Sequence, residues 1–244
     1  MPRGRKGTDM ASTHTGRRTV MVTGAAGTLG GAVAAAFAAE GDNLVLLDRR
    51  EARPPAGLDA ASCLVVAVDL LDAGQVADAA GRARDRFGAI DVLCNIAGGF
   101  RMGEAVHETG DATWDFLLDL NARSIIHTAR AVVPGMVERG EGRIVNVAAY
   151  AAQRGVAGMG AYCASKSAVM RLTESMAAEL RERGINVNGV MPTIIDTPEN
   201  RRDMPDADPA RWVAPADLAE VIRFLASPAA RAVHGAVVPV TGLS

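Results

Sequence analysis

The fold is decided between Thr19 and Gly30, where the chain reads TVMVTGAAGTLG. Residues 19–23 are β-branched or apolar and predict a short buried strand, and the glycines after them predict a tight turn that opens a helix. A strand, a glycine-rich turn and a helix in this order form the first half of a βαβ unit. The stretch therefore predicts an α/β fold whose first strand lies within a parallel sheet.

On the C-terminal side of this stretch, short apolar runs alternate with longer segments rich in alanine and leucine. Near-continuous apolar runs such as 44–47 are typical of strands that are covered on both faces. The pattern predicts strands at 19–23, 43–48, 63–68, 91–95, 143–147, 185–191 and 236–240, and helices at 29–40, 73–87, 112–138, 160–183 and 216–226. It indicates one Rossmann-type, doubly wound domain with a seven-stranded parallel sheet and helices on both faces.

The composition narrows the classes of partner. Of the 244 residues 49% are hydrophobic and 22% charged, and the formal net charge is -2. Such a chain can bury a large core, and its charge favours neither nucleic acid nor an anionic membrane as partner, so a small-molecule partner is expected. No apolar run approaches the roughly 20 residues needed to span a bilayer, and we expect a cytoplasmic location. Cys63, Cys94 and Cys163 are odd in number and widely spaced, which predicts neither a disulfide framework nor a metal site.

Two segments stand apart from the regular pattern. Residues 1–18 are basic and have no apolar run, and we interpret them as a disordered tail rather than a nucleic-acid-binding arm, which leaves 19–244 as the folded domain. Residues 193–214 are polar and interrupted by Pro198, Pro205 and Pro209, and they are too long for a simple connection. We expect this second segment to cover the substrate as a loop, with Trp212 as an anchor or as ordinary packing.

The glycine-rich turn points to a nucleotide. Gly24, Gly27, Thr28, Leu29 and Gly30 would let the backbone approach a pyrophosphate, whose charge the free N–H groups of a helix N-terminus stabilise. A tight turn without a ligand is the alternative, but the position after the first strand of a βαβ unit favours a dinucleotide.

The second strand carries the residues that would choose between dinucleotides. Asp48 ends it, eighteen residues after Gly30, where a carboxylate can bind ribose hydroxyls and repel a 2′-phosphate. NAD is therefore the expected cofactor. NADP remains possible, because Arg49 and Arg50 follow and could pair with that phosphate.

Tyr162 and Lys166 lie four residues apart on a predicted helix and therefore on one face. A nearby ammonium favours the phenolate form of tyrosine and would lower the phenol pKa toward neutrality. The pair could thus serve as an acid and base, although a solvated surface pair has the same spacing.

In the order and spacing of several motifs the chain resembles the short-chain dehydrogenases/reductases, from about residue 19 to the C-terminus. The glycine turn, Asp69, the stretch from Asn95 to Gly98, Asn121, the Tyr162 and Lys166 pair, and Pro192 with Thr193 and Thr197 are similar to that family's motifs. The resemblance implies hydride transfer with Tyr162 as acid, Lys166 on the cofactor ribose and Asn121 in a proton relay behind Lys166. It also implies cofactor contacts at Asp69, Leu70, Asn95, Ala97, Gly98, Pro192, Ile195 and Thr197, and a homo-oligomer (dimer or tetramer) formed through the helices of Asn121 and Tyr162.

The sequence departs from the family pattern at two places. Its glycine turn fits TGxxGxxG rather than the common TGxxxGxG, and Ala149 stands where the family has a catalytic serine, thirteen residues before Tyr162. Tyr150 or Gln153 could supply the missing hydrogen-bond donor, although Tyr150 should point to the opposite face if its strand continues.

The family's dihydropteridine reductases also lack this serine, and residues 196–201, 204–208 and 212 resemble their segments. We therefore expect an NAD(P)-dependent oxidoreductase acting on a small carbonyl, alcohol or quinonoid (pterin-like) substrate. The alternative hypothesis is a nicotinamide-binding sensor or scaffold with weak catalysis.

Overall fold

All seven strands form one parallel sheet in the computed structural model, which describes residues 16–244. The strands pair in the order β3-β2-β1-β4-β5-β6-β7, and each pairing is parallel. They are β1 (Thr19–Thr23), β2 (Asn43–Asp48), β3 (Cys63–Ala67), β4 (Val92–Asn95), β5 (Gly142–Val147), β6 (Ile185–Pro192) and β7 (Val237–Val240). The predicted fold class is confirmed, and the expected strand ends differ by one residue at most.

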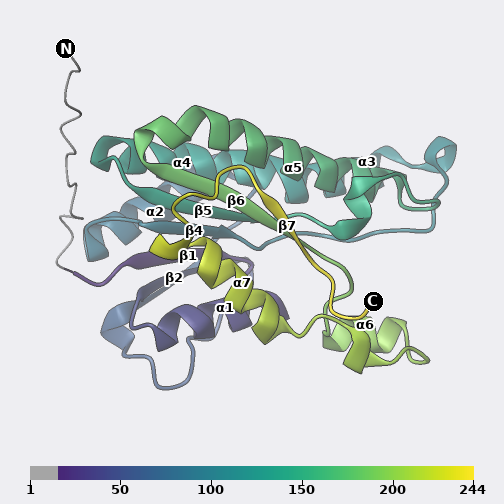
Figure 1. The fold of residues 1–244 in the computed structure, drawn as a ribbon, viewed down its shortest axis with the longest axis horizontal. Coiled ribbons are helices and arrows are strands. Elements are labelled where there is room, and N and C mark those ends of the chain that lie inside the picture. Colours follow the sequence, from purple (N-terminus) through teal and green to yellow (C-terminus); the bar gives the residue numbers. More distant parts are fainter. Residues whose placement is uncertain (1–15) are drawn as a thin grey trace, which may run out of the picture.

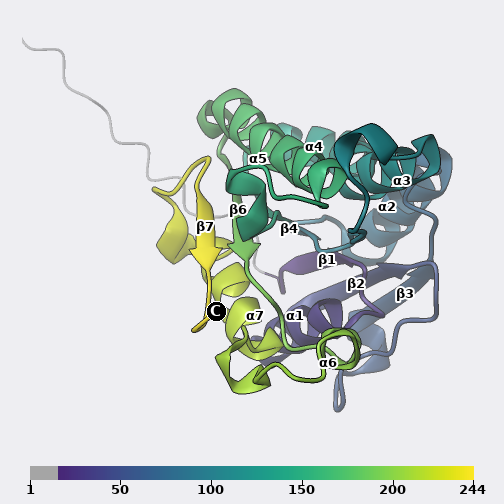
Figure 2. The same cartoon turned by 90° about the vertical axis from the view of Figure 1, so that its right-hand side faces the viewer.

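Helices cover both faces of this sheet (Figures 1 and 2). On one face lie α1 (Thr28–Ala39) and α7 (Pro215–Leu225), and on the other lie α2 (Ala73–Phe87), α4 (Ser124–Arg139) and α5 (Gly160–Leu180). The shorter helix α3 (Asp111–Leu118) packs beside α5, and α6 (Pro198–Asp203) lies close to the C-terminus. Because the sheet is buried on both faces, its strands need apolar side chains on both sides.

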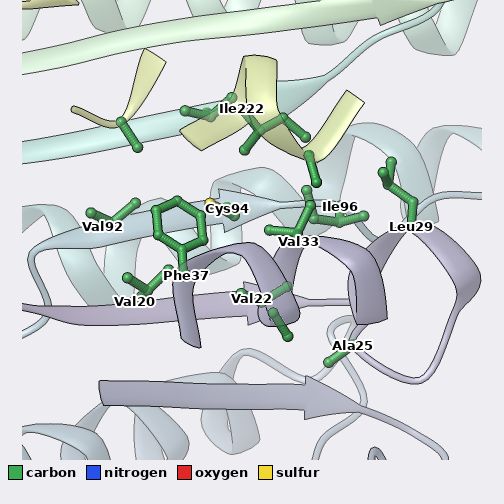
Figure 3. Packing of buried hydrophobic residues seen from close by; sticks show 14 of the residues in the cluster. Val20, Val22, Ala25, Leu29, Val33, Phe37, Val92, Cys94, Ile96 and Ile222 are labelled. Carbon is green, nitrogen blue, oxygen red and sulfur yellow. The ribbon is translucent and has the colours of Figure 1, made fainter. Parts of the chain in front are cut away.

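The alternation of side chains along β1 shows how both cores form. Val20 and Val22 point toward α1 and α7 and pack with Phe37 and Ile222 (Figure 3). Met21, between them, belongs to the core on the other face, under α2, α4 and α5. Each of the three β1 side chains is fully buried. Successive residues of a strand face opposite sides, so an uninterrupted apolar run supplies both cores.

The helix predicted over 112–138 is not uniform. The structure begins it at Asp111, inserts a π-helical turn over Asp119–Arg123, and continues it as α4 to Arg139. The π-helical turn adds one residue to a helical turn and shifts the face that later side chains present. Periodicity over a long window does not detect such an insertion, and here it falls on Asn121, a predicted site residue.

The N-terminal boundary of the domain was predicted slightly late. Arg18 forms an ion pair with Asp42 at 2.7 Å, and Arg17 donates a hydrogen bond to Ser62 at 2.7 Å. Both arginines were assigned to a tail that ends at residue 18, but their partners belong to the folded domain. The remainder of the predicted tail, residues 1–15, lies outside the described residues.

Within residues 16–244, no helix is both long and apolar enough to cross a membrane. Cys63, Cys94 and Cys163 are buried and unpaired. Burial raises the pKa of the Cys94 thiol, so this side chain packs as a small neutral group.

The sheet reverses its winding direction between β1 and β4. From β1 the chain moves outward to β2 and β3, and it then returns to place β4 on the other side of β1. In open α/β sheets, ligands bind in the crevice outside the carboxyl ends of the strands at such a reversal. The glycine turn after β1 and the Asn95–Gly98 segment after β4 both lie there.

Candidate active site

The glycine turn after β1 is built for a close backbone approach. Gly24 has φ +67°, and a Cβ there would lie 2.8 Å from the Cα of Ala97. A Cβ on Gly30 would collide with the carbonyl oxygen of Gly24. Both positions therefore require glycine, because no side chain could fit without moving backbone.

Helix α1 leaves its first N–H groups available. Gly27 is its N-cap and no side chain caps it, and the first helical bond runs from the Gly31 N–H to the Gly27 carbonyl. The N–H groups of Thr28, Leu29 and Gly30 belong to the first turn, which has no intrahelical acceptors. A pyrophosphate placed here would accept these hydrogen bonds, so the turn fits the phosphates of a dinucleotide.

A cavity of about 530 Å³ opens beside this turn. Predicted residues from four chain segments line it: Gly24, Gly27, Leu29, Gly30, Asp48, Arg49, Asp69, Leu70, Ala97 and Gly98. Arg50, which the sequence also offered as a partner for a 2′-phosphate, lines it as well. Three lining residues were not predicted: Val68, Ile96 and Leu120. Each of the three is next to a predicted residue in the chain, so a wider window around each motif would have found them.

Asp48 connects the second strand to the glycine turn. Its carboxylate accepts one hydrogen bond from the Ala26 N–H at 3.1 Å and another from the Arg50 N–H at 3.0 Å. The side chain of Arg50 lies 3.8 Å from it, whereas Arg49 forms no hydrogen bond or ion pair within residues 16–244. The cavity wall thus carries a fixed carboxylate and, next to it, an uncommitted guanidinium.

Asp69 lies in the cavity wall and also stabilises the turn that follows β3. It lines the cavity, and its carboxylate also accepts a hydrogen bond from the Leu71 N–H at 3.0 Å, which shapes the turn after β3. The carbonyl of the adjacent Leu70 contacts the Nδ1 atom of His127 at 2.8 Å. This part of the cavity wall is therefore held from α4.

Tyr162 and Lys166 project from the first turns of α5. Lys166 is buried, and its Nζ atom donates a hydrogen bond to the Val147 carbonyl at the end of β5, at 2.9 Å. Tyr162 is half-buried, and its ring meets the Phe100 ring edge to face at a centroid distance of 4.8 Å. The pair is thus not the solvated surface pair that the same spacing could also give.

Gly98 joins the cavity to Lys166 and Asn121. It lines the cavity, and a Cβ at this position would lie 2.9 Å from Lys166 Nζ and 2.8 Å from Asn121 Oδ1. The ammonium and the amide therefore lie directly against the cavity wall at a residue without a side chain. A molecule that fills the cavity along Gly98 reaches both groups.

The Asn121 side chain fixes the segment after β4. Its Oδ1 atom accepts a hydrogen bond from the Gly99 N–H at 2.8 Å, and its Nδ2 atom donates to the Gly99 carbonyl at 3.0 Å and to Ser165 Oγ at 2.9 Å. These three hydrogen bonds tie the segment after β4 to α5, so the side chain braces that segment. The π-helical turn at Asp119–Arg123 turns it toward Gly99 and α5.

Burial shifts the pKa values of Tyr162 and Lys166 in directions that their spacing in the sequence does not predict. Burial raises the pKa of Tyr162 to about 12, although the sequence predicted a lowered value. It also lowers the pKa of Lys166 from 10.5 to about 8. The expectation counted only the neighbouring ammonium, whereas desolvation is the largest influence on the buried phenol. At neutral pH the phenol still holds its proton and the ammonium is still charged.

The lowered pKa of Lys166 has a consequence for stability. Between pH 8 and 10.5 the unfolded chain binds a proton at Lys166 that the folded chain releases, so the free energy of unfolding rises with pH. Below pH 8 the lowered pKa of Lys166 destabilises the folded state by about 3 kcal/mol. We expect wild type to gain stability relative to Lys166→Met between about pH 7 and pH 10. Chemical denaturation of both proteins across this range measures the difference. A difference that stays constant would contradict the prediction, because the lost hydrogen bond to Val147 changes stability equally at every pH.

Ala149 is buried at the end of β5, where the family pattern has a serine. The strand ends at Val147 and a short 3₁₀ helix follows over Tyr150–Gln153, so the alternation expected for a continuing strand does not apply to Tyr150. Tyr150 and Gln153 are both exposed. Neither contacts Tyr162 through a ring contact or hydrogen bond within the described residues.

The segment 193–214 is more regular than expected. It contains α6, which Thr197 caps through the Asn200 N–H at 3.1 Å, and a 3₁₀ turn at Pro209–Arg211. Asn200 also donates to the Ile195 carbonyl at 2.8 Å, and Trp212 is buried. The polar groups of Ile195 and Thr197 that the family resemblance assigns to the cofactor thus hold α6 in this structure.

Several predicted cofactor residues do not line the cavity of about 530 Å³: Thr28, Asn95, Tyr162, Lys166, Pro192, Ile195 and Thr197. The Asn95 side chain points into the core, where it donates to Asn146 at 2.8 Å and accepts from Thr128 at 2.9 Å. The remainder flank the cavity along the same carboxyl edge of the sheet, on β6 and its loop or on α1 and α5.

Thr23 was not predicted as a site residue, yet its hydroxyl oxygen accepts hydrogen bonds from the Ile96 and Ala97 N–H groups at 3.0 and 3.1 Å. It ties the end of β1 to the segment after β4, across the reversal of the sheet. A threonine at a strand end carries no signal in the sequence for such a long-range contact.

Comparison with known proteins agrees with this geometry. Residues 18–208 match the short chain dehydrogenase family. The 2-(R)-hydroxypropyl-CoM dehydrogenase of Xanthobacter autotrophicus is 36% identical over 92% of this chain and 97% of its own length, and the galactitol 2-dehydrogenase (L-tagatose-forming) of Cereibacter sphaeroides is 36% identical over 91% and 92%.

Solved structures agree as well. Levodione reductase superposes with a TM-score of 0.82 at 30% identity, over 92% of this chain and 96% of that one. The 3-ketoacyl-(acyl-carrier-protein) reductase from Brucella melitensis, complexed with NADH, also has a TM-score of 0.82, at 29% identity over 92% and 97%. The matched family region contains the glycine turn, Asn121, Tyr162 and Lys166. The chain belongs to the short-chain dehydrogenase family.

Proposed function

We propose that this enzyme transfers a hydride between a nicotinamide dinucleotide and a small carbonyl, alcohol or quinonoid substrate. The observation that supports this most is the position of Gly98, which lines the cavity and lies directly against Lys166 and Asn121. The hypothesis of a scaffold without catalysis is not favoured, because the relatives are named dehydrogenases and reductases. Turnover on a panel of ketones, alcohols, quinones and pterins with NADH and NADPH tests the proposal, and no turnover with any pair would contradict it.

In this proposal each residue has a defined task. When bound, the cofactor supplies or accepts the hydride at its nicotinamide ring. The first-turn N–H groups of α1 hold the phosphates, Asp48 holds the adenosine ribose, and Lys166 holds the second ribose. Tyr162 gives its phenolic proton to the substrate oxygen or nitrogen during reduction and takes it back during oxidation. Asn121 keeps the Gly98–Gly99 segment in place.

The raised pKa of Tyr162 keeps the proton on the phenol before reduction. A phenol with a pKa of about 12 is protonated near pH 7, although it is a weaker acid than an unperturbed tyrosine. The charged Lys166 nearby favours a phenolate once the proton has left, because an opposite charge stabilises the ionised form. We propose that residues 193–214 cover the substrate during this step.

We propose NAD rather than NADP as the preferred cofactor, because Asp48 is fixed by two backbone N–H groups in the cavity wall. Wild type is expected to bind NADH more tightly than NADPH. Asp48→Asn removes the repulsion of a 2′-phosphate and leaves Arg49 available, so NADPH binding should improve by roughly tenfold. Dissociation constants from cofactor fluorescence measure this. Tighter binding of NADPH by wild type would contradict the assignment, and Arg49→Gln in the Asp48→Asn background should reverse the gain.

We also propose a homo-oligomer, a dimer or tetramer formed through the helices that carry Asn121 and Tyr162. Trp114 on α3 and Ile126 on α4 are 46% and 38% exposed, which leaves apolar area to cover on this face. Light scattering at micromolar concentration should give a mass of at least two chains, and Ile126→Asp should lower it. A monomeric wild type would contradict the proposal.

A further inference from the structure

The segment from Gly98 to Arg101 is held rigidly beside the catalytic tyrosine. Gly99 exchanges two hydrogen bonds with the Asn121 amide, and a Cβ on Gly99 would lie 2.7 Å from the Phe116 ring. The guanidinium of Arg101 lies over the same Phe116 ring, 4.0 Å from its centroid. We call these contacts of Gly99 and Arg101 with Asn121 and Phe116 the clamp. The backbone on both sides of Phe100 is therefore fixed by groups that belong to α3 and the π-helical turn.

This clamp determines where the Phe100 ring lies. The ring meets Tyr162 at an interplanar angle of 86° and a centroid distance of 4.8 Å, which is a favourable edge-to-face arrangement. The contact does not bury Phe100, which remains 54% exposed. A large apolar side chain is thus displayed next to the proton donor, although burying it would be favourable.

Two polar side chains that hold this segment have partners elsewhere. Arg101 lies over the Phe116 ring, and the Asn121 amide is bonded to Gly99 and Ser165. The surface that Phe100 offers beside Tyr162 is therefore apolar and aromatic. It suits a flat, apolar group better than a chain of hydroxyls.

We propose that Phe100 is a specificity-determining residue, whose exposed ring packs against an aryl or other flat, unsaturated group next to the reacting carbon of the substrate. This inference rests on the proposed function, because it places the substrate at Tyr162. It narrows the substrate class to ketones, alcohols or quinonoid compounds that carry such a group. The edge-to-face contact with Tyr162 sets the position of the Phe100 ring.

Binding to a variant with strongly reduced turnover tests the inference directly. In the Tyr162→Phe background with oxidised cofactor, calorimetry compares 1-phenylethanol with 2-octanol, which has the same number of carbon atoms. Adding Phe100→Ala should weaken binding of 1-phenylethanol by roughly threefold to tenfold, the size of one aromatic contact, and leave 2-octanol nearly unchanged. Phe100→Leu keeps apolar bulk without the ring and should give the same selective loss. Met102→Ala, which removes another exposed apolar side chain from the same segment, should change neither.

The outcomes separate this inference from the proposed function. Equal losses for the two alcohols, no loss for either, or no binding of 1-phenylethanol would overturn the role of Phe100. Turnover of acetophenone and 2-octanone by wild type and by Phe100→Ala gives the second measurement, and the variant should lose kcat/KM selectively on acetophenone. If wild type turns over no substrate of the full panel, the proposed function fails; if wild type is active but the variant shows no selectivity, only the role of Phe100 fails.

Discussion

Replacing Tyr162 by phenylalanine is expected to lower kcat by roughly 10² to 10⁴, the usual contribution of a general acid or base. The ring and its edge contact with Phe100 remain, and only the hydroxyl that holds the proton is lost. Because that hydroxyl acts in the transition state, kcat and kcat/KM should fall together while the dissociation constant of the cofactor stays nearly the same. Steady-state kinetics and cofactor titration of the same preparation measure both.

The control for this variant is Tyr150→Phe. Tyr150 is the chain's other tyrosine and is exposed on the 3₁₀ helix after β5. If Tyr162 is the acid, Tyr150→Phe should keep most of the activity. A Tyr162→Phe enzyme with undiminished turnover would exclude Tyr162 as proton donor, and a large loss only in Tyr150→Phe would transfer the role to that residue.

Replacing Ala149 by serine is expected to raise kcat/KM on simple ketones by up to roughly 10²-fold. A single preorganised donor to a developing oxyanion contributes on the order of 3 kcal/mol in other enzymes, and Ala149 supplies none. A quinonoid or imine-like substrate delocalises the charge that develops and needs less of this support. On such a substrate the variant should perform about as well as wild type.

The conclusion about Ala149 depends on comparing two classes of substrate, simple ketones and quinonoid compounds, with the same Ala149→Ser variant. A gain restricted to simple ketones supports a site adapted to substrates that need no serine. Wild type that is already as fast on simple ketones as on quinonoid or pterin-like compounds would contradict it, and Gln153→Ala would then test whether Gln153 supplies the donor. Ala149→Val serves as the control for added volume without a hydrogen-bond donor, and it should show no gain.

The glycine turn and the strand pattern were readable from the sequence because they depend on neighbouring residues. Val20, Met21 and Val22 predict a strand covered on both faces, and the structure places them in two separate cores. Likewise, Gly24 and Gly30 mark a turn in which no Cβ fits. Their signals lie within a few residues of each other, which is the range over which periodicity and turn chemistry act.

The behaviour of Asn121, Tyr162 and Lys166 depends on residues far away in the chain. Spacing placed Tyr162 and Lys166 on one face of a helix, but their burial follows from β5 and from the segment that contains Phe100. That burial reverses the expected shift in the Tyr162 pKa, because desolvation depends on every element packed around a group. The bracing role of Asn121 depends in the same way on a π-helical turn that no helical pattern predicts.

The sequence by itself therefore determined the parallel sheet, the glycine turn and the identity of the candidate acid and its lysine, since local periodicity, glycine and fixed spacing define them. Only the tertiary structure decided that Gly98 brings the cavity against Lys166, that Thr23 ties the ends of β1 and β4 together, and that Phe100 stands beside Tyr162. These contacts join segments tens of residues apart, and their geometry is set by how the strands and helices pack rather than by any neighbouring residue.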